Sequence, residues 1–208
     1  MSIRLAGSLW SIPVPDRERV AARLASEGLL RWHWDVSDGV FAAPGGFDPT
    51  EAARIGAATG LPGEAHLMVV DPLQHVAPWA EICDTVVVHA EATGWRAAVE
   101  AIVAAGRQAA VAIAPGTPTE VVAGLPAGVG VLVMSVEPGR AAEPFAPETY
   151  QRLDRLSGRR LLGVDGSVDL ERGLACVRHR ATWLVSGSAL TAADDPHRWI
   201  ARITTADE

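Results

Sequence analysis

Short apolar runs alternate with amphipathic segments along the whole chain, and this alternation limits the fold more than any other feature. The apolar runs are uninterrupted, as in strands that are buried on both faces of a sheet. Several of the segments between them begin at Pro, Thr or Asp, which are typical first residues of helices. We expect strands at 3–10, 29–36, 64–70, 84–90, 108–114, 130–136, 160–165 and 181–186, and helices at 15–27, 49–59, 73–82, 93–105, 117–124, 147–157, 168–176 and 194–203.

Eight strands alternating with eight helices in 208 residues predict an α/β fold, a compact (β/α)8 TIM barrel with short connections. The main alternative is a doubly wound open sheet. The first strand is not followed by a G-x-G-x-x-G turn, and this absence favours the barrel. No linker or low-complexity segment divides the chain, so we expect one TIM-barrel domain over residues 1–208. Two loops are expected, at residues 42–48 and 137–145.

The composition restricts both the partners and the chemistry. The net charge is −7 and the basic residues are scattered, which argues against nucleic acid and against an anionic membrane surface. No apolar run could span a bilayer, and we expect no signal peptide. Cys83 and Cys176 lie in apolar settings outside any CxxC pair, as is typical of buried thiols in a reducing cytoplasm.

Every one of the 18 positive residues is arginine, and the chain contains no lysine. Schiff-base chemistry, a lysine general base and a P-loop lysine are therefore excluded. Some barrel enzymes that act on sugar phosphates depend on such a lysine. This chain must use other groups.

The strand expected at 29–36 carries a histidine and an aspartate, His33 and Asp35, at its carboxyl end. Alternation along a strand places both on one face and Trp32 and Trp34 on the other. Burying an imidazole beside a carboxylate requires a partner, and a divalent metal suits both groups. Taken alone, the stretch favours a satisfied core histidine beside a helix-capping aspartate. The rest of the chain has to decide between these interpretations.

The other strands also end in polar residues or glycine, with the exception of Ala114. In a barrel the chemistry lies at the carboxyl ends of the strands, so one site fed by many strands is the simplest explanation. Four of these residues form a ligand set of two nitrogens and two oxygens that leaves positions open for two substrate oxygens. They are His33, Asp35, His66 and Asp165.

The remaining histidines are weaker metal candidates. His75, His179 and His197 fall on expected helices and are expected at the surface. His89 ends a strand beside the ligand set. It can hold a ligand in place without binding the ion, or it can be an ordinary buried histidine, and both interpretations stay open.

The last two strands run directly into helix starts through small residues, at Asp165-Gly166-Ser167 and Ser186-Gly187-Ser188. Small residues there expose backbone N–H groups that can bind a phosphate at the positive end of a helix. Phosphate sites recur at this place in the barrel fold. Gly-Ser is also common at tight turns for steric reasons. The two turns together predict a phosphate site made by Gly166, Ser167, Gly187 and Ser188.

Eight segments match a known family in order and spacing: 7–11, 33–39, 66–69, 88–92, 115–118, 134–139, 164–166 and 187–189. Through them the chain resembles the ribulose-phosphate 3-epimerase family from end to end. The resemblance implies a barrel of the ribulose-phosphate-binding type that holds one divalent metal ion (zinc, iron, manganese or cobalt). The ion would be bound by His33, Asp35, His66 and Asp165, while Ser8, Met68 and Met134 would contact the substrate.

The resemblance also implies an isomerase of carbohydrate metabolism. The default reaction is D-ribulose 5-phosphate to D-xylulose 5-phosphate, in the pentose phosphate class. Of Asp35 and Asp165, one would remove a proton from one face of C3 and the other would deliver a proton to the opposite face, through an enediolate that the metal stabilises. We expect a small-molecule sugar phosphate as partner, a homo-oligomer, and a cytoplasmic location.

The chain departs from the family pattern around the substrate but not at the metal ligands. Two alternatives follow: an epimerase or isomerase of another sugar, such as a hexulose 6-phosphate or an intermediate of specialised metabolism, and a non-catalytic barrel that binds a metal or a sugar phosphate. The departures are Ser37 in place of methionine, Ala114 in place of asparagine, Ser167 in place of a second glycine, and residues 137–143 in place of a glycine-rich lid.

Arg140 lies in that altered lid. Without lysine, arginine is the only permanent cation available to meet a phosphate, and it can do so with two parallel hydrogen bonds. The alternative is a solvated loop arginine paired with Glu137 or Glu143. The sequence leaves both interpretations open.

Overall fold

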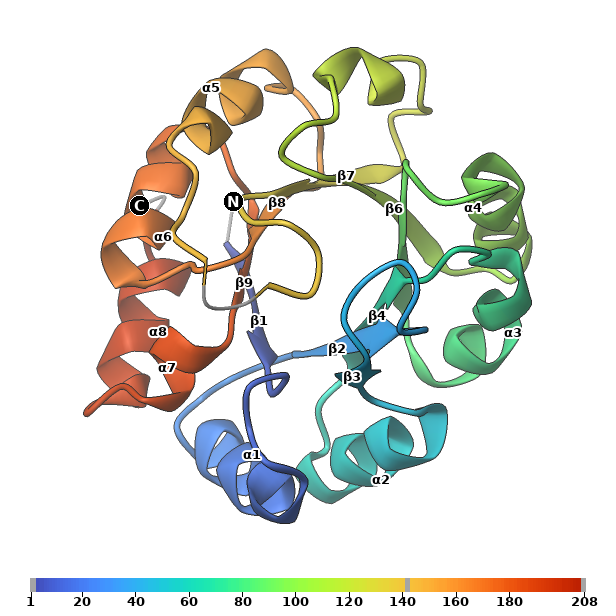
Figure 1. Ribbon diagram of the computed structural model, residues 1–208. Helices are drawn as coiled ribbons and strands as arrows, with labels where there is room; N and C mark the ends of the chain where they lie inside the picture. The colour runs from blue at the N-terminus through green and yellow to red at the C-terminus, as the bar shows by residue number, and fades with distance from the viewer. Residues whose placement is uncertain (1–2, 141–142, 207–208) are drawn as a thin grey trace.

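A closed barrel of eight parallel strands forms the centre of the structure, a computed structural model that describes residues 3–140 and 143–206 (Figure 1). Each strand is parallel to both neighbours, and β1 pairs with β2 on one side and β9 on the other, which closes the ring. The predicted TIM barrel is therefore confirmed. The strands are β1 (Arg4–Ser8), β2 (Trp32–Ser37), β4 (Gly63–Met68), β5 (Thr85–His89), β6 (Gln108–Ile113), β7 (Gly130–Met134), β8 (Leu162–Asp165) and β9 (Trp183–Ser186).

Helices form a ring outside the strands (Figure 1). Their ends follow local rules of capping. The helix at 49–59, for example, starts with Pro49 after Asp48, whose side chain accepts a hydrogen bond from the Glu51 N–H, and it ends at the left-handed Gly60. The helices are α1 (Arg17–Ser26), α2 (Pro49–Thr59), α3 (Leu73–Ile82), α4 (Trp95–Ala104), α5 (Glu148–Arg155), α6 (Leu170–Arg178), α7 (Ser188–Thr191) and α8 (Pro196–Thr204), with a 3-10 turn η1 at Val14–Asp16.

Three elements differ from the expectations. The helix expected at 117–124 is wrong: only a 3-10 helix, η2 (Thr119–Val122), forms there, between Pro118 and Pro126. The loop at 42–48 contains a short strand, β3 (Gly45–Gly46), antiparallel to β2. The short α7 directly after β9 is missing from the expected helix ranges, although a helix start was expected at Ser186-Gly187-Ser188, where α7 begins.

The core has two layers that follow the alternation of the strands. The larger layer lies between the strands and the helices and takes up Trp32 and Trp34; the Trp32 indole donates a hydrogen bond to Thr59 of α2. The smaller layer fills part of the barrel interior with residues such as Val87, Leu132 and Trp183. The rest of that interior is polar: His33, Glu64, His66 and His89 are all fully buried. Such a set of buried polar side chains requires partners.

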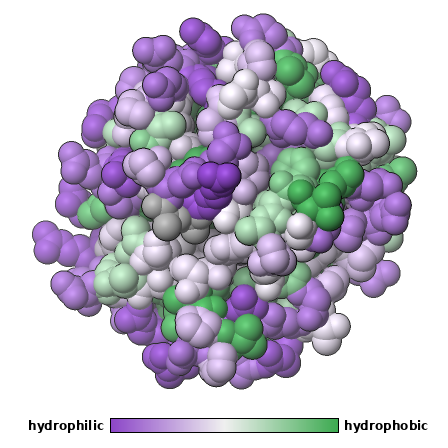
Figure 2. All heavy atoms as spheres, viewed as in Figure 1, coloured by the Kyte–Doolittle hydropathy of each residue, from purple (hydrophilic) through white to green (hydrophobic). Residues whose placement is uncertain are grey.

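The face of the barrel that looks toward the viewer in Figure 1 is largely hydrophilic around its rim, with hydrophobic residues in a few separate patches (Figure 2). Large exposed apolar side chains include Val14, Val40 and Leu73. Within the described parts of the chain, no helix is long and apolar enough to cross a membrane.

Candidate metal centre and substrate pocket

Two histidines and two aspartates meet at the carboxyl ends of three strands. His33 and Asp35 come from β2, His66 from β4 and Asp165 from the end of β8. The β2–β4 register sets Asp35 beside His66, so these two side chains enter the barrel at the same level. One donor atom from each of the four residues lies within 4.8 Å of all the others. The structure thus brings together all four residues of the expected ligand set.

The spacing of the donor atoms fits a divalent metal ion. The His33 Nε2 and His66 Nδ1 atoms are 3.1 Å apart, and their distances to Asp35 Oδ1 and Asp165 Oδ2 are 3.4–3.6 Å. Neighbouring ligand atoms about 2.1 Å from one ion lie about 3.0–3.4 Å from one another, whether the ion has six ligands or four. Two imidazoles and two carboxylates are also a donor set that such ions prefer. The residues present therefore fit the ion.

The electrostatics of the cluster also favour a cation. Burial opposes protonation of His33, but the carboxylates of Asp35, Glu64 and Asp165 outweigh it and raise the His33 pKa well above its ordinary value. Burial would raise the Asp35 pKa, yet His33 and His66 hold it below its usual range. The neighbouring carboxylates thus favour a positive charge on the His33 ring. A bound divalent ion would supply that charge instead.

His33 has a carboxylate on its far side. The His33 Nδ1 atom is 2.7 Å from Glu64 Oε1, and both side chains are fully buried. A carboxylate oxygen without a proton only accepts hydrogen bonds, so His33 donates from Nδ1, and its Nε2 atom, which faces the cluster, is the one that would bind an ion. Glu64 in turn accepts hydrogen bonds from Arg4 and from the Trp183 indole.

His66 is supported by a longer chain of hydrogen bonds. Its Nε2 atom is 2.8 Å from His89 Nε2, and His89 Nδ1 is 3.1 Å from Glu91 Oε2. Glu91 also accepts from the Ala114 N–H and from the Thr117 hydroxyl. Burial lowers the pKa of His89 to about 4, so it is neutral and can accept the His66 proton while donating its own to Glu91. This order leaves His66 Nδ1 free to bind an ion, and it makes His89 a support rather than a ligand.

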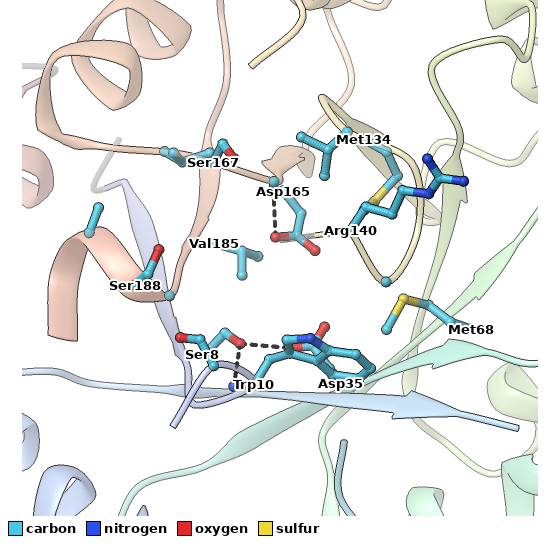
Figure 3. A pocket seen from close by; sticks show the side chains of 17 residues that line it. Ser8, Trp10, Asp35, Met68, Met134, Arg140, Asp165, Ser167, Val185 and Ser188 are labelled. Atoms are coloured by element: carbon cyan, nitrogen blue, oxygen red, sulfur yellow. Dashed lines mark hydrogen bonds between the residues drawn. The ribbon is translucent and has the colours of Figure 1, made fainter. Parts of the chain in front are cut away.

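A pocket opens above the cluster, and Asp35 and Asp165 both line it. Figure 3 shows these two carboxylates on opposite sides of the pocket. Ser167 and Ser188 lie along one end, and Met68 and Met134 lie toward the other. Every substrate-contacting residue expected from the sequence belongs to this lining: Ser8, Met68, Met134, Arg140, Gly166, Ser167, Gly187 and Ser188. Their contact with a substrate remains a prediction.

In both Asp35 and Asp165, one carboxylate oxygen faces the histidines and the other accepts a hydrogen bond. Asp35 Oδ2 accepts from the Ser8 hydroxyl at 2.6 Å, and the same Ser8 oxygen accepts from the Trp10 N–H at 3.2 Å (Figure 3). Asp165 Oδ1 accepts from the Gly166 N–H at 2.7 Å. The side chain of Asp35 is 9% exposed and that of Asp165 is 16% exposed, so both can reach a molecule in the pocket.

The two small-residue turns border the same end of the pocket. Gly166 has φ +103° and Ser167 has φ +47°, so the chain turns sharply just after Asp165. The Ser167 hydroxyl donates to the Glu143 carbonyl at 2.6 Å, and the Ser167 carbonyl accepts from Arg172. Gly187 precedes α7 and packs close to Ser8. Both turns line this end of the pocket, as a shared phosphate site would require.

Arg140 lines the pocket but lies away from these turns. Its guanidinium donates to Glu143 at 2.8 Å, the side chain is 65% exposed, and it points away from Ser167 and Ser188 in Figure 3. The lid around it contains residues 141–142, which lie outside the described residues. The observed ion pair is the one that the solvated-arginine interpretation expects. Such exposed pairs contribute little, so they do not prevent the guanidinium from moving to a phosphate.

Several site residues were not identified from the sequence. Glu64 is charged within an otherwise apolar strand and shares a face with His66, which was a usable signal. Trp10 lines the pocket, and its ring packs over the β3 glycines, Gly45 and Gly46. Ser37, which stands where the family pattern has methionine, is not among the described residues that line the pocket. Its hydroxyl donates to the Ala42 carbonyl.

Comparisons with known proteins match the chain over nearly its whole length. The model of the ribulose-phosphate 3 epimerase family matches residues 4–191. A ribulose-phosphate 3-epimerase of Chlamydia trachomatis is 33% identical over 198 residues, which covers 89% of this chain and 85% of the relative. The enzyme of the same name from Mycobacterium bovis is 32% identical over 204 residues, covering 93% of this chain and 89% of the relative.

Among solved structures, the chain is similar to 3-hexulose-6-phosphate synthase from Salmonella typhimurium, with a TM-score of 0.76 and 15% identity over 98% of both chains. Phosphoribosyl anthranilate isomerase from Thermus thermophilus has a TM-score of 0.66 at 16% identity, also over 98% of both chains. At such low identity these similarities concern the fold alone.

Proposed function

This chain belongs to the ribulose-phosphate 3-epimerase family and is an isomerase of the epimerase type, and we propose that it inverts C3 of a ketose phosphate with a bound divalent metal ion. The default substrate pair is D-ribulose 5-phosphate and D-xylulose 5-phosphate. The observation that carries this proposal is the position of Asp35 and Asp165, which flank one pocket from opposite sides directly above two buried imidazoles.

Inversion at C3 requires that a proton leaves one face of the sugar and that another arrives on the opposite face. Asp35 enters the pocket from β2 and Asp165 from β8, so one carboxylate can take the proton while the other delivers one. The Ser8 hydroxyl donates a hydrogen bond to Asp35, and the Gly166 N–H donates one to Asp165, so both side chains are held in place beside the sugar. In each direction of the reaction one of them acts as the carboxylate that takes a proton, and the other acts, in its protonated form, as the acid that delivers one.

His33, Asp35, His66 and Asp165 would hold the ion. When bound, it supplies a Lewis acid that stabilises the negative charge that develops on the sugar oxygens as the proton leaves C3. Glu64 and His89 keep the two imidazoles in the tautomers that this role needs. Met68 and Met134 form an apolar wall of the pocket that excludes water from the reacting carbon.

The phosphate of the substrate would lie at the end of the pocket where Gly166, Ser167, Gly187 and Ser188 meet. This end is separated from the two methionines, so a ketose phosphate would span the pocket with C3 between the two carboxylates. Ser188 is the first residue of α7, so its backbone N–H has no acceptor within that short helix and could donate to the phosphate.

The proposal is tested by following ribulose 5-phosphate in D2O by NMR with metal-loaded protein. Xylulose 5-phosphate should appear, and solvent deuterium should enter C3 in both epimers. Asp35→Asn and Asp165→Asn should each slow net epimerisation by about 10²–10⁴-fold, as expected for loss of one proton-transfer group. Asp154→Asn, at an exposed carboxylate paired with His179, is the matched control and should be fully active.

The ion content of each variant must be measured and restored with excess metal. In Asp165→Asn the amide oxygen is expected to keep the hydrogen bond from the Gly166 N–H. The amide nitrogen then faces His33 and His66, and because it cannot act as a ligand, the ion should bind more weakly. A near-normal rate in either metal-loaded Asn variant would exclude that residue from proton transfer. If metal-loaded wild-type protein exchanges C3 of neither pentulose nor hexulose phosphates, the proposed reaction is wrong.

A further inference from the structure

We propose that Glu64, fixed by Arg4 and Trp183, is a positioning residue that sets the affinity of the centre for its ion by orienting and polarising His33. The inference rests on the metal centre of the proposed function. It concerns a carboxylate that lies inside the barrel below the four donor groups and does not line the pocket above them.

The contacts of Glu64 use both of its oxygens. Oε1 lies 2.7 Å from His33 Nδ1 and 2.9 Å from Trp183 Nε1, while Oε2 lies 2.6 Å from Arg4 Nη2. The indole and the guanidinium can only donate, so they hold the carboxylate as an acceptor. His33 must then donate from Nδ1. Its Nε2 atom is left to face Asp35 and Asp165, where it would bind the ion in place of a proton.

The carboxylate is anchored by the barrel itself. Glu64 belongs to β4, Arg4 to β1 and Trp183 to β9, so three separate strands fix its position. Arg4 is held further by a hydrogen bond to Thr85 of β5 at 2.9 Å and by its place over the Trp183 ring, 5.3 Å from the centroid. A group with these restraints keeps one orientation, and it transmits that orientation to His33.

A buried ion pair such as Glu64–Arg4 is a poor source of stability, because desolvating the two charges costs about as much as their attraction returns. An apolar pair would fill the same space at no such cost. The contact with His33 provides a reason for the charged Glu64 side chain. A carboxylate behind a metal-binding imidazole makes the imidazole a stronger ligand and fixes its tautomer.

The two imidazoles of the centre are supported differently. On the side of each ring that faces away from the ion, Glu64 contacts His33 Nδ1 directly, whereas His66 Nε2 reaches a carboxylate, that of Glu91, only through the neutral His89. A negative charge in contact with the ring polarises it more than one that acts through a second ring. His33 is therefore the ligand whose strength depends most on its outer partner.

The test is the affinity of the protein for Zn²⁺ and Co²⁺, measured by competition with a chelating dye. Glu64→Gln keeps the size of the side chain and an accepting oxygen but removes the charge. It should weaken metal binding by about 10–100-fold. The visible absorption bands of the Co²⁺ form should also shift, because His33 becomes a weaker ligand. Circular dichroism and thermal unfolding of the metal-free proteins report on the fold.

Two further variants make the outcome decisive. Asp84→Asn is the matched control, because Asp84 lies 3.8 Å from the same Arg4 but does not contact His33, and its metal affinity should equal that of the wild type. If Glu64→Gln does not fold because Arg4 is left unpaired, the double variant Arg4→Met with Glu64→Gln removes both charges and should fold with the same loss of affinity.

Wild-type affinity in a folded Glu64→Gln or double variant would overturn the inference and reduce Glu64 to a structural ion pair. An equal loss in Asp84→Asn would overturn it as well. If the wild-type protein itself binds no ion, the proposed metal centre fails, which is a result distinct from either of these.

Discussion

Replacing Gly166 with alanine should destabilise the protein and disturb the site, because the turn after β8 has no room for a side chain. The backbone at Gly166 has φ +103°, which residues with a Cβ rarely adopt. An added Cβ would lie 2.6 Å from Val136 Cγ2, 2.9 Å from the Ser135 hydroxyl and 3.1 Å from the Val136 backbone nitrogen. The neighbouring strand end would have to move.

The magnitude follows from two separate costs. The unfavourable backbone conformation costs alanine about 1–3 kcal/mol. Inserting a methyl group into a packed region costs about 1–3 kcal/mol more. Gly166→Ala should therefore lower the free energy of unfolding by about 2–6 kcal/mol, a large part of the stability of an ordinary domain.

Gly60→Ala is the matched control. Gly60 ends α2 with φ +69°, and a Cβ there would meet nothing within 4 Å, so only the backbone cost of about 1–2 kcal/mol applies. Urea unfolding followed by tryptophan fluorescence gives both values. Turnover should fall in Gly166→Ala alone, because its N–H holds Asp165 in place. Equal destabilisation of the two variants, with equal activity, would refute the claim that this turn is tightly packed against β7.

Three further predictions concern the ion, the lid and pH. His66→Ala should retain the barrel but lose the ion that we expect at about one per chain; stoichiometric metal in the purified variant would contradict the ligand assignment. Arg140→Ala should weaken binding of a phosphorylated ketose and leave the unphosphorylated sugar unaffected, as measured by calorimetry; equal effects would remove Arg140 from phosphate binding. Hydrogen bonds hold the Glu91 pKa at about 2 against an ordinary value of 4.5, although burial opposes this. Its contribution to stability is therefore present above pH 4.5 and lost as the pH falls toward about 2, and acid titrations of Glu91→Gln should show a smaller loss over that range.

The four donor residues could be identified from the sequence because two local rules suffice for them. Alternation along a strand puts His33 and Asp35 on one face, and the barrel fold brings all carboxyl strand ends to one rim. His66 and Asp165 then follow from their places at the ends of apolar runs. These rules need only the order of residues, which is what a sequence provides.

The support of the donors could not be identified in this way, since it depends on contacts between distant strands. Trp183 is 119 residues from Glu64 in the chain, and nothing local indicates that its indole lies behind His33. The same limit applies to Trp10, whose position in the pocket depends on the packing of β3 against β2. The segment expected as a helix at 117–124 forms only a 3-10 helix, and its amphipathic pattern does not distinguish the two kinds of helix.

The most direct test of the whole account is the rate of deuterium exchange at C3 of ribulose 5-phosphate, measured as the ion content is varied from none to about one per chain. Metal-stripped protein should exchange no deuterium and form no xylulose 5-phosphate. The rate should then rise in proportion to the bound ion and level off when the site formed by His33, Asp35, His66 and Asp165 is full. Full exchange by protein that contains no ion, or no exchange at one ion per chain, would contradict a metal-dependent 3-epimerase.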